Sequence, residues 1–222
     1  MADNTMEANK KSAGPLLFSI IVLAAFILVL AFTPSRELFK AATAAHPFLM
    51  GFAKFALLAT VGELLAIRLT KKFWSFPSGF FARAFVWGFL GMVIALMFKV
   101  YWGGVAYIIQ MGFIPGASGP LLPAFLCSLV MNVTFAPTMM IFHKITDTAI
   151  TMKYNGERLI SLKNVVGNID FKTLIGFTIA VTVPCFWIPA HTVSFMLPGE
   201  YQIIMAASLS IALGIILSLK KN

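Results

Sequence analysis

Five polar side chains that could do chemistry fall inside, or at the ends of, long apolar stretches of this sequence. They are Glu63, Arg83, Lys99, Asn132 and His191. An ionisable side chain at the centre of a membrane span costs roughly 2.5–3.5 kcal/mol on insertion scales, so such residues usually face a protein interior or a hydrated path. We therefore take these five as candidate polar residues of a pathway through a membrane.

Glu63 and Arg83 lie at matching depths in consecutive apolar stretches. Glu63 comes shortly before the end of one stretch, and Arg83 comes shortly after the start of the next. If the two stretches cross a membrane in opposite directions, both residues approach the same face, which allows an ion pair. The alternative is that Arg83 extends to lipid phosphates while Glu63 meets water.

Lys54 and Lys99 lie toward the opposite face, at about the depth of His191 and Glu200. Lys54 precedes Glu63 by nine positions, which puts the two side chains about 180° apart around a helix axis. They therefore cannot share one face of a straight helix. Lys99 is the stronger functional candidate, because its stretch otherwise carries small residues suited to close helix packing, namely Ala84, Gly88, Gly91 and Ala95. Extension of either ammonium to the membrane surface is the alternative.

The remaining residue patterns argue against a metal site, a cofactor and an enzyme. The three histidines are dispersed over the chain, and no HxxxH or HExxH spacing occurs. No nucleophile elbow, phosphate-binding loop or paired carboxylates on one helix face are present. Cys127 and Cys185 both fall in apolar stretches, where we expect buried free thiols. The basic residues form no face interleaved with aromatics, which argues against nucleic acid as a partner.

These candidates are carried by six apolar stretches, which predict an all-α, polytopic membrane helix bundle. Hydrophobic residues make up 59% of the 222 residues and charged residues 11%, a balance that a soluble domain does not have. The stretches are Pro15–Phe32, Pro47–Ile67, Phe80–Trp102, Leu121–Phe142, Leu174–Ala190 and Tyr201–Leu219. We expect kinked or broken helices near Pro137, Pro184 and Pro189, because proline removes a helical hydrogen bond. Interrupted helices at membrane depth often line cavities.

Basic residues gather in every second connection between these stretches. Excess Lys and Arg mark the loops that stay in the cytosol, so the pattern predicts both termini on the cytosolic side. The basic residues of that side are Lys10, Lys11, Arg68, Lys71, Lys72, Arg83, Lys144, Lys153, Arg158, Lys163, Lys172, Lys220 and Lys221. The opposite side carries only Arg36 and Lys40 in its loops.

The connections between the stretches carry their own signals. Ser35–Ala45 predicts a short polar helix capped by Ser35 and lying on the outer surface. Residues 103–119 are uncharged and predict an outer loop. Asn155-Gly156 predicts a turn, after which Leu159, Leu162, Val166 and Ile169 share one face of a predicted amphipathic interfacial helix. A short hairpin at Asn155-Gly156 is the alternative.

A series of short strings occurs in the order found in one membrane-protein family. The strings are Ala44-Ala45-His46-Pro47, Gly62-Glu63, Arg83 before Gly88 and Gly91, Phe98-Lys99-Val100, Phe135-Ala136-Pro137, Phe186-Trp187-Ile188-Pro189, and Phe195 to Pro198 with Tyr201. Over about residues 44–219 the chain resembles the Mpv-seventeen / peroxisomal-membrane-protein-twenty-two family. It departs from the family pattern where Glu63 replaces Asp, Met92 replaces Pro, Met131-Asn132 replaces Asp-Gln, and Gln202 replaces Arg.

The resemblance implies a membrane protein that forms a pore or moves small metabolites, and it gives a division of the chain. Residues 1–14 would be a cytosolic tail, 15–33 an added anchor helix, and 44–222 a family-like bundle of five segments with an interfacial loop at 145–172. The expected partners are the lipid bilayer, small solutes, and a second copy or another membrane protein. A non-transporting scaffold subunit of a membrane complex is the alternative function. Asp3 and Glu7 in the tail are untypical of a transit peptide, which favours a bacterial cytoplasmic membrane over a mitochondrial or peroxisomal one.

Overall fold

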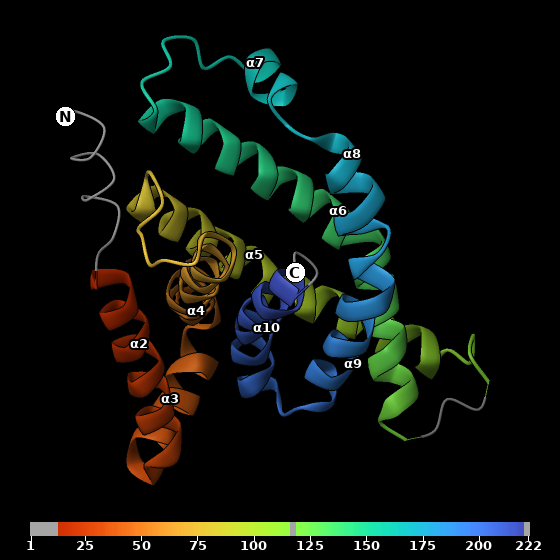
Figure 1. Ribbon diagram of the computed structural model, residues 1–222. Helices are drawn as coiled ribbons and strands as arrows, with labels where there is room; N and C mark the ends of the chain where they lie inside the picture. Colours follow the sequence, from red (N-terminus) through yellow and green to blue (C-terminus); the bar gives the residue numbers. More distant parts are fainter. Residues whose placement is uncertain (1–12, 116–118, 220–222) are drawn as a thin grey trace, which may run out of the picture. The chain divides into compact units, whose positions relative to one another are not determined.

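The computed structural model describes residues 13–115 and 119–219, and all regular structure in these ranges is helical (Figure 1). Most of the tail expected over residues 1–14, and the C-terminal Lys220 and Lys221, lie outside these ranges. The helices are α2 (Gly14–Ala31), α3 (Thr33–Ala45), α4 (Pro47–Lys71), α5 (Phe80–Gln110), α6 (Leu121–Tyr154), α7 (Leu162–Gly167), α8 (Phe171–Thr173), the π-helices η1 (Leu174–Ile179) and η2 (Val183–Trp187), α9 (Ile188–Met196) and α10 (Gly199–Leu219).

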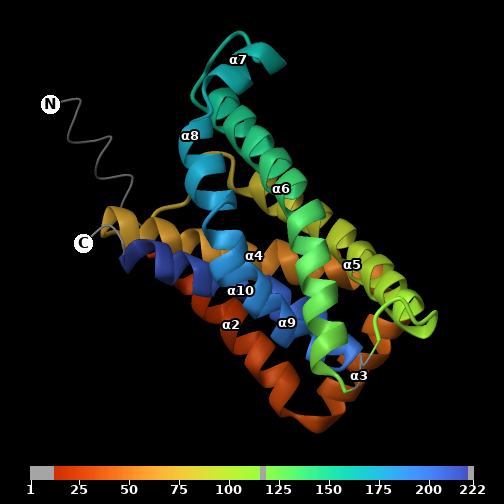
Figure 2. The ribbon, with the colours of Figure 1, turned by 90° about the vertical axis from the view of Figure 1, so that its right-hand side faces the viewer.

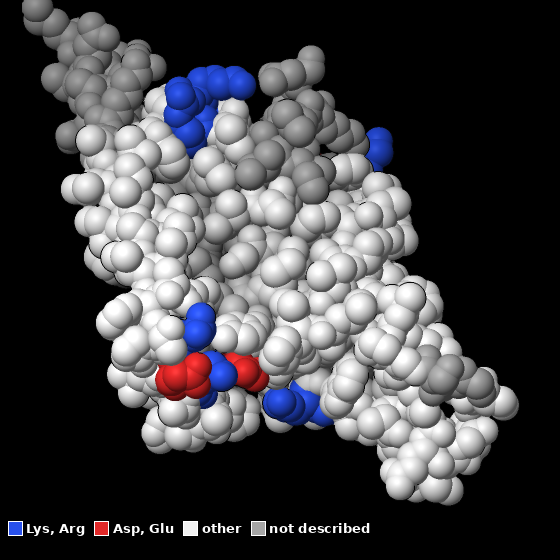
Figure 3. All heavy atoms as spheres, turned by 90° about the horizontal axis from the view of Figure 1, so that it is seen from below, with Lys and Arg blue, Asp and Glu red and all other residues white. Residues whose placement is uncertain are grey.

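Five helical segments are long and apolar enough to cross a membrane, so the chain is a multi-pass membrane protein. These spans are α2, α4, α5, α6 and the segment Phe171–Met196, which joins α8, η1, η2 and α9. The sixth expected stretch forms α10, whose described side chains give a shorter apolar helix, Gly199–Leu213. In the view of Figure 3 most of the surface carries no charge, and Lys, Arg, Asp and Glu gather in small groups.

The chain divides into two compact units. The first consists of the residues up to Gly91 together with those from Ala207 onward, and the second consists of Met92–Ala206. Helices α5 and α10 contribute residues to both units. The first unit therefore holds α2, α3, α4 and the start of α5, and the second holds α6 through α9.

The short polar helix predicted over Ser35–Ala45 is present as α3, but the predicted serine cap is wrong. The helix begins at Thr33, and Pro34 in its first turn supplies the fixed φ that suits a helix start. The Ser35 hydroxyl instead donates to the carbonyls of Val29 (3.0 Å) and Phe32 (2.9 Å) at the end of α2. Ser35 therefore ties the two helices together.

In the first unit, α4 and α5 approach each other at glycines. A Cβ built on Gly91 would lie 2.3 Å from the Gly51 carbonyl oxygen and 2.6 Å from the Phe55 Cβ. A Cβ on Gly88 would lie 2.6 Å from the Phe52 ring. The small residues singled out in the sequence thus allow close helix packing, as in other membrane helix pairs.

Two helices run further than their apolar stretches predict. Residues 103–110, expected in a loop, continue α5 to Gln110, and α6 continues past Phe142 to Tyr154. Each ends where a glycine adopts positive φ. At Gly112 (φ +77°) the Phe113 N–H bonds the Ile108 carbonyl, and at Gly156 (φ +83°) the Glu157 N–H bonds the Met152 carbonyl. This pattern is the Schellman C-cap, which satisfies the last carbonyls of a helix.

The prolines bend and widen helices without breaking them. Pro137 lies inside the continuous helix α6, which changes direction near its middle (Figure 2). Pro184 lies in the first turn of η2 and Pro189 in the first turn of α9. The span Phe171–Met196 thus stays helical, but it is wound partly as π-helix around the positions where breaks were predicted.

The predicted amphipathic helix after Asn155-Gly156 is mostly wrong. The turn itself is present, but the only helix between residues 157 and 170 is α7, which has six residues. Ser161 caps it by accepting the Asn164 N–H at 3.2 Å. Of the four predicted residues, Ile169 is buried, Val166 is partly buried, and Leu159 and Leu162 are exposed, so they do not share a buried face.

The contact at Gly91 predicts that alanine substitutions at two glycines of α5 differ strongly in their effect on stability. Gly91→Ala would press its Cβ into the Gly51 carbonyl, and overpacking of this kind costs about 1–3 kcal/mol. Gly104→Ala is the matched control, because a Cβ there meets nothing within 4 Å. We expect thermal unfolding in detergent to show a clear loss for Gly91→Ala and none for Gly104→Ala. Equal melting of the two variants would contradict the close α4–α5 packing.

Candidate functional site

A hollow of about 520 Å³ opens in the second unit between α5 and the turn that joins α9 to α10. Helix α5 presents Lys99 and Trp102, which are three residues apart and so share a face. The opposite wall is formed by the turn and by Gln202 of α10. The lining residues are Lys99, Trp102, Pro120, Phe195, Met196, Leu197, Pro198, Gly199 and Gln202.

Lys99 supplies the charge of this hollow. Its side chain is exposed, and within the described part of the chain it makes no hydrogen bond or ion pair. Its Nζ lies 3.5 Å from the position that a Cβ on Gly199 would take, so the ammonium stands next to the first residue of α10. The first backbone N–H groups of a helix lack partners within the helix, which gives this end a partial positive charge. Glu200 adds one carboxylate to the same turn.

The wall opposite Lys99 is held in place by hydrogen bonds and ring contacts. The Gln202 Nε2 donates to the Leu197 carbonyl at 3.0 Å, and the Leu197 N–H donates to the Ser194 carbonyl at 3.2 Å. The Trp102 and Phe195 rings stack with centroids 6.1 Å apart and planes 16° apart. The hollow therefore places a cation beside a rigid apolar surface.

A buried polar cluster joins α6 to α9 in the same unit. The Asn132 Nδ2 donates to the Ser128 carbonyl at 2.8 Å, and the Ser128 hydroxyl donates to the Ile188 carbonyl at 2.7 Å. Because a carbonyl can only accept, the first bond fixes the Asn132 amide. Its Oδ1, 3.1 Å from the His191 Nδ1, must then accept, so the proton lies on Nδ1. Asn132 and Ser128 are fully buried and His191 nearly so.

Aromatic rings connect the buried cluster to the hollow. His191 stacks on Trp187 (centroids 5.3 Å, planes 26° apart) and meets the edge of Phe98 at 5.7 Å. Phe98 in turn contacts Phe195, a lining residue, at 4.6 Å. The Trp187 Nε1 is buried and has no hydrogen-bond partner among the described residues. Asn132 and His191 are therefore brought together, and a ring series leads from them toward Lys99.

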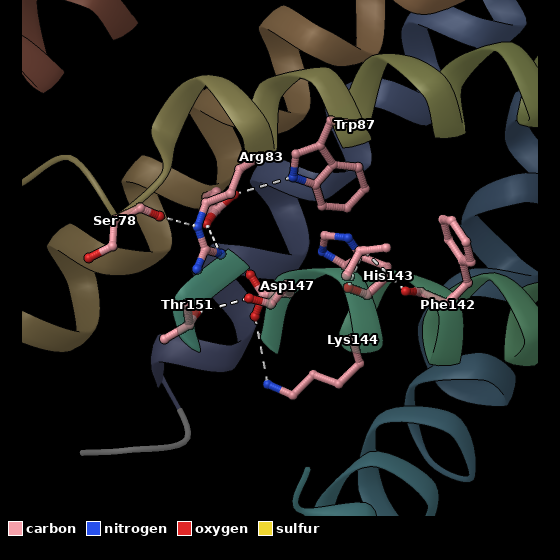
Figure 4. A network of polar contacts seen from close by, with 10 residues as sticks. Ser78, Arg83, Trp87, Phe142, His143, Lys144, Asp147 and Thr151 are labelled. Carbon is pink, nitrogen blue, oxygen red and sulfur yellow. Dashed lines mark hydrogen bonds and ion pairs between the residues drawn. The ribbon is translucent and has the colours of Figure 1, made fainter. Parts of the chain in front are cut away.

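Glu63 and Arg83 form the expected ion pair in the first unit. The Arg83 Nη1 lies 3.0 Å from the Glu63 Oε1, and the Arg83 Nε donates to the Ser78 carbonyl at 2.8 Å. The Trp87 Nε1 donates to the other Glu63 oxygen at 3.3 Å. Figure 4 shows Arg83 and Trp87, one turn apart on α5, both directed toward this carboxylate. Trp87 was absent from the sequence-based candidates, although its position four residues after Arg83 places it on the same face.

Lys54 does not extend to the membrane surface, because its side chain is only 1% exposed. Its Nζ donates to the Thr43 hydroxyl at 3.0 Å and lies 4.4 Å from the centre of the Phe39 ring. Both partners belong to α3. The ammonium thus docks the polar helix α3 on α4 through a hydrogen bond and a cation–π contact.

Comparisons of this chain with protein-family models, with curated proteins and with solved structures found no match. Among the described residues, no group of three or more His, Cys, Asp or Glu is placed to hold a metal ion.

The Glu63–Arg83 pair predicts that charge, and not only shape, stabilises the first unit. Glu63→Gln keeps the size of the side chain but removes the charge-assisted bonds to Arg83 and Trp87, which we expect to cost about 1.5–3 kcal/mol. Thermal unfolding in detergent measures the loss. The charge-swapped double variant Glu63→Arg/Arg83→Glu should recover part of it, and a double variant no more stable than the weaker single one would contradict the pairing.

The Asn132–His191 bond predicts strong coupling between the two positions. His191→Phe keeps a ring but leaves the buried Asn132 Oδ1 without its donor, which should cost about 1–3 kcal/mol. Asn132→Leu/His191→Phe removes both polar groups, so the double variant should lose less than the sum of the single losses. A double-mutant cycle of unfolding free energies measures this coupling. Strict additivity would show that the two side chains do not interact.

Proposed function

We propose that this protein passes small anionic solutes across a membrane, and that the hollow at Lys99 is the entrance of their path. One observation carries the proposal: an ammonium without an ion-pair partner in the described part of the chain lines an open hollow of about 520 Å³. Small-molecule sites typically measure about 300–1,000 Å³, so a metabolite-sized solute fits. A charge in a membrane span is costly, so an ionisable residue that is kept there commonly marks a substrate or ion path.

The surroundings of Lys99 favour an anion with an apolar part. The ammonium and the start of α10 attract negative charge to one side of the hollow. Trp102, one turn from Lys99 on α5, stacks on Phe195 of α9 and offers an apolar surface in the same hollow. A small carboxylate that carries a hydrocarbon portion matches both.

The span Phe171–Met196 supports a path that continues from the hollow. Its π-helical turns are a feature frequently found at functional sites. Its Ile188 carbonyl accepts hydrogen bonds from the hydroxyls of Ser128 and Thr192, both at 2.7 Å, so side chains bond the backbone next to the π-helical turns. Asn132 and His191 provide polar groups beside this segment.

We also propose that the chain is a relative of the Mpv-seventeen / peroxisomal-membrane-protein-twenty-two family with an added first span, α2. The short motifs given in the sequence analysis support this relation, and the distribution of basic loops supports cytosolic termini. The acidic residues of the tail favour a bacterial cytoplasmic membrane. The scaffold alternative predicts a filled interior and an exposed face of small residues on α5 or on α2. On α5, Gly88 and Gly91 are covered by α4, which does not favour a docking face there.

The proposal predicts lysine-dependent anion flux. Proteoliposomes containing the full chain should release acetate faster than empty vesicles and faster than they release glycerol. Lys99→Met keeps the length of the side chain but removes the charge, and we expect acetate flux to fall about tenfold or more, as for a lost charge-assisted contact.

Arg36→Met is the matched control, because it removes an exposed cation of α3 and should leave flux unchanged. Wild-type flux equal to that of empty vesicles, with folded protein, would contradict the transport function. Normal flux in Lys99→Met would instead show that the path does not pass this hollow.

A further inference from the structure

The connection between α6 and α8 carries large apolar side chains outside the membrane-spanning helices. Leu159, Ile160 and Leu162 are 74%, 41% and 68% exposed. They belong neither to the span that ends at Tyr154 nor to the one that begins at Phe171. An exposed group of aliphatic side chains commonly marks a site that binds a protein or a membrane.

These side chains point outward from an ordered loop. The Asn164 Nδ2 donates to the Leu159 carbonyl at 3.2 Å, and the Ser161 hydroxyl caps α7. Met152, Val165 and Ile169 of the same region are buried at 3%, 3% and 7% exposure. The loop therefore sorts its apolar residues into an inner set that packs and an outer set that does not.

Exposed basic residues lie before and after the outer apolar set in the sequence. They are Lys153, Arg158, Lys163 and Lys172, and the loop also carries the acidic residues Glu157 and Asp170. The Asp170 carboxylate is engaged locally, since it accepts the Thr173 N–H at 3.0 Å and the Thr173 hydroxyl at 2.6 Å. These bonds hold the pKa of Asp170 below its ordinary value. The remaining charge of the loop is predominantly positive.

We infer that this basic loop, residues 153–172, binds an anionic lipid surface, with Leu159, Ile160 and Leu162 inserted at the acyl boundary and the cations on headgroup phosphates. The pairing of apolar and basic side chains is what interfacial segments use to hold anionic membranes. The loop joins two spans, and the second begins one residue after Asp170, so its position is tied to the bilayer.

The location of the outer side chains is tested with a fluorescent label in nanodiscs. Leu162→Cys is labelled with bimane on a Cys127→Ala/Cys185→Ala background, and quenching by doxyl-labelled lipid is measured. Gly167→Cys is the matched control within the same helix, because a Cβ there meets nothing within 4 Å. We expect severalfold stronger lipid quenching at position 162 than at 167. Equal and weak quenching at both would place the loop in water or on a protein partner and would overturn the inference.

The role of charge is tested by lipid composition. Quenching at position 162 should rise as phosphatidylglycerol replaces phosphatidylcholine, and Arg158→Ser/Lys163→Ser should weaken this response by about fivefold per basic residue removed. Arg36→Ser, outside the loop, should leave it unchanged. Quenching that ignores phosphatidylglycerol, or a response that survives the double substitution, would show that the loop does not recognise anionic lipid. None of these readouts depends on solute flux.

Discussion

Polar groups inside a bilayer must find partners within the protein, because hydrocarbon offers neither donors nor acceptors. Most polar features of this chain follow from that constraint. Pro184 and Pro189 lack the N–H that would bond a carbonyl one turn earlier, and the span is wound partly as π-helix around them. Where η2 meets α9, the hydroxyls of Thr192 and Ser128 both donate to the Ile188 carbonyl. The same Ser128 receives the Asn132 amide, whose oxygen then orients His191. An irregular backbone and a buried side-chain cluster are thus parts of one hydrogen-bond network.

The same constraint applies in the first unit, where the polar groups that find partners are charged side chains and not hydroxyls. Glu63 receives Arg83 and Trp87 from successive turns of α5, and Lys54 is covered by Thr43 and Phe39 of α3. Close helix packing accompanies these contacts. Gly91 brings α5 against the Gly51 carbonyl, and a larger residue there would increase the separation of the helices. The same pair of helices, α4 and α5, thus carries both the close glycine contact and the Glu63–Arg83 ion pair.

Matching positions along two consecutive helices could be predicted from the sequence, whereas rotation about a helix axis could not. Glu63 and Arg83 were paired correctly because both are counted from the same short connection between α4 and α5. Asn132 and His191 were both identified, but not as partners, because their contact depends on how α6 and α9 turn toward each other.

The ends of two helices were predicted wrongly because hydropathy shows which residues are apolar and not where a helix ends. Gly112 and Gly156 end α5 and α6 by capping geometry, some residues beyond the apolar stretches. The loop helix was predicted too long because the Ser161 cap, which starts α7 at Leu162, was overlooked.

Lys99 departs from the pattern that the other intramembrane charges follow. Arg83 and Lys54 are buried and bonded to neighbouring helices, whereas the Lys99 ammonium faces a hollow and has no ion pair in the described part of the chain. If its role were only to stabilise helix packing, a buried acceptor would serve it as Glu63 serves Arg83. The turn opposite is held by the Gln202 amide nitrogen, which donates to the Leu197 carbonyl, and the Lys99 ammonium bonds no acceptor among the described residues. The ammonium therefore lines the hollow without an ion-pair partner in the described part of the chain, and this arrangement is the physical basis for proposing a solute path at Lys99.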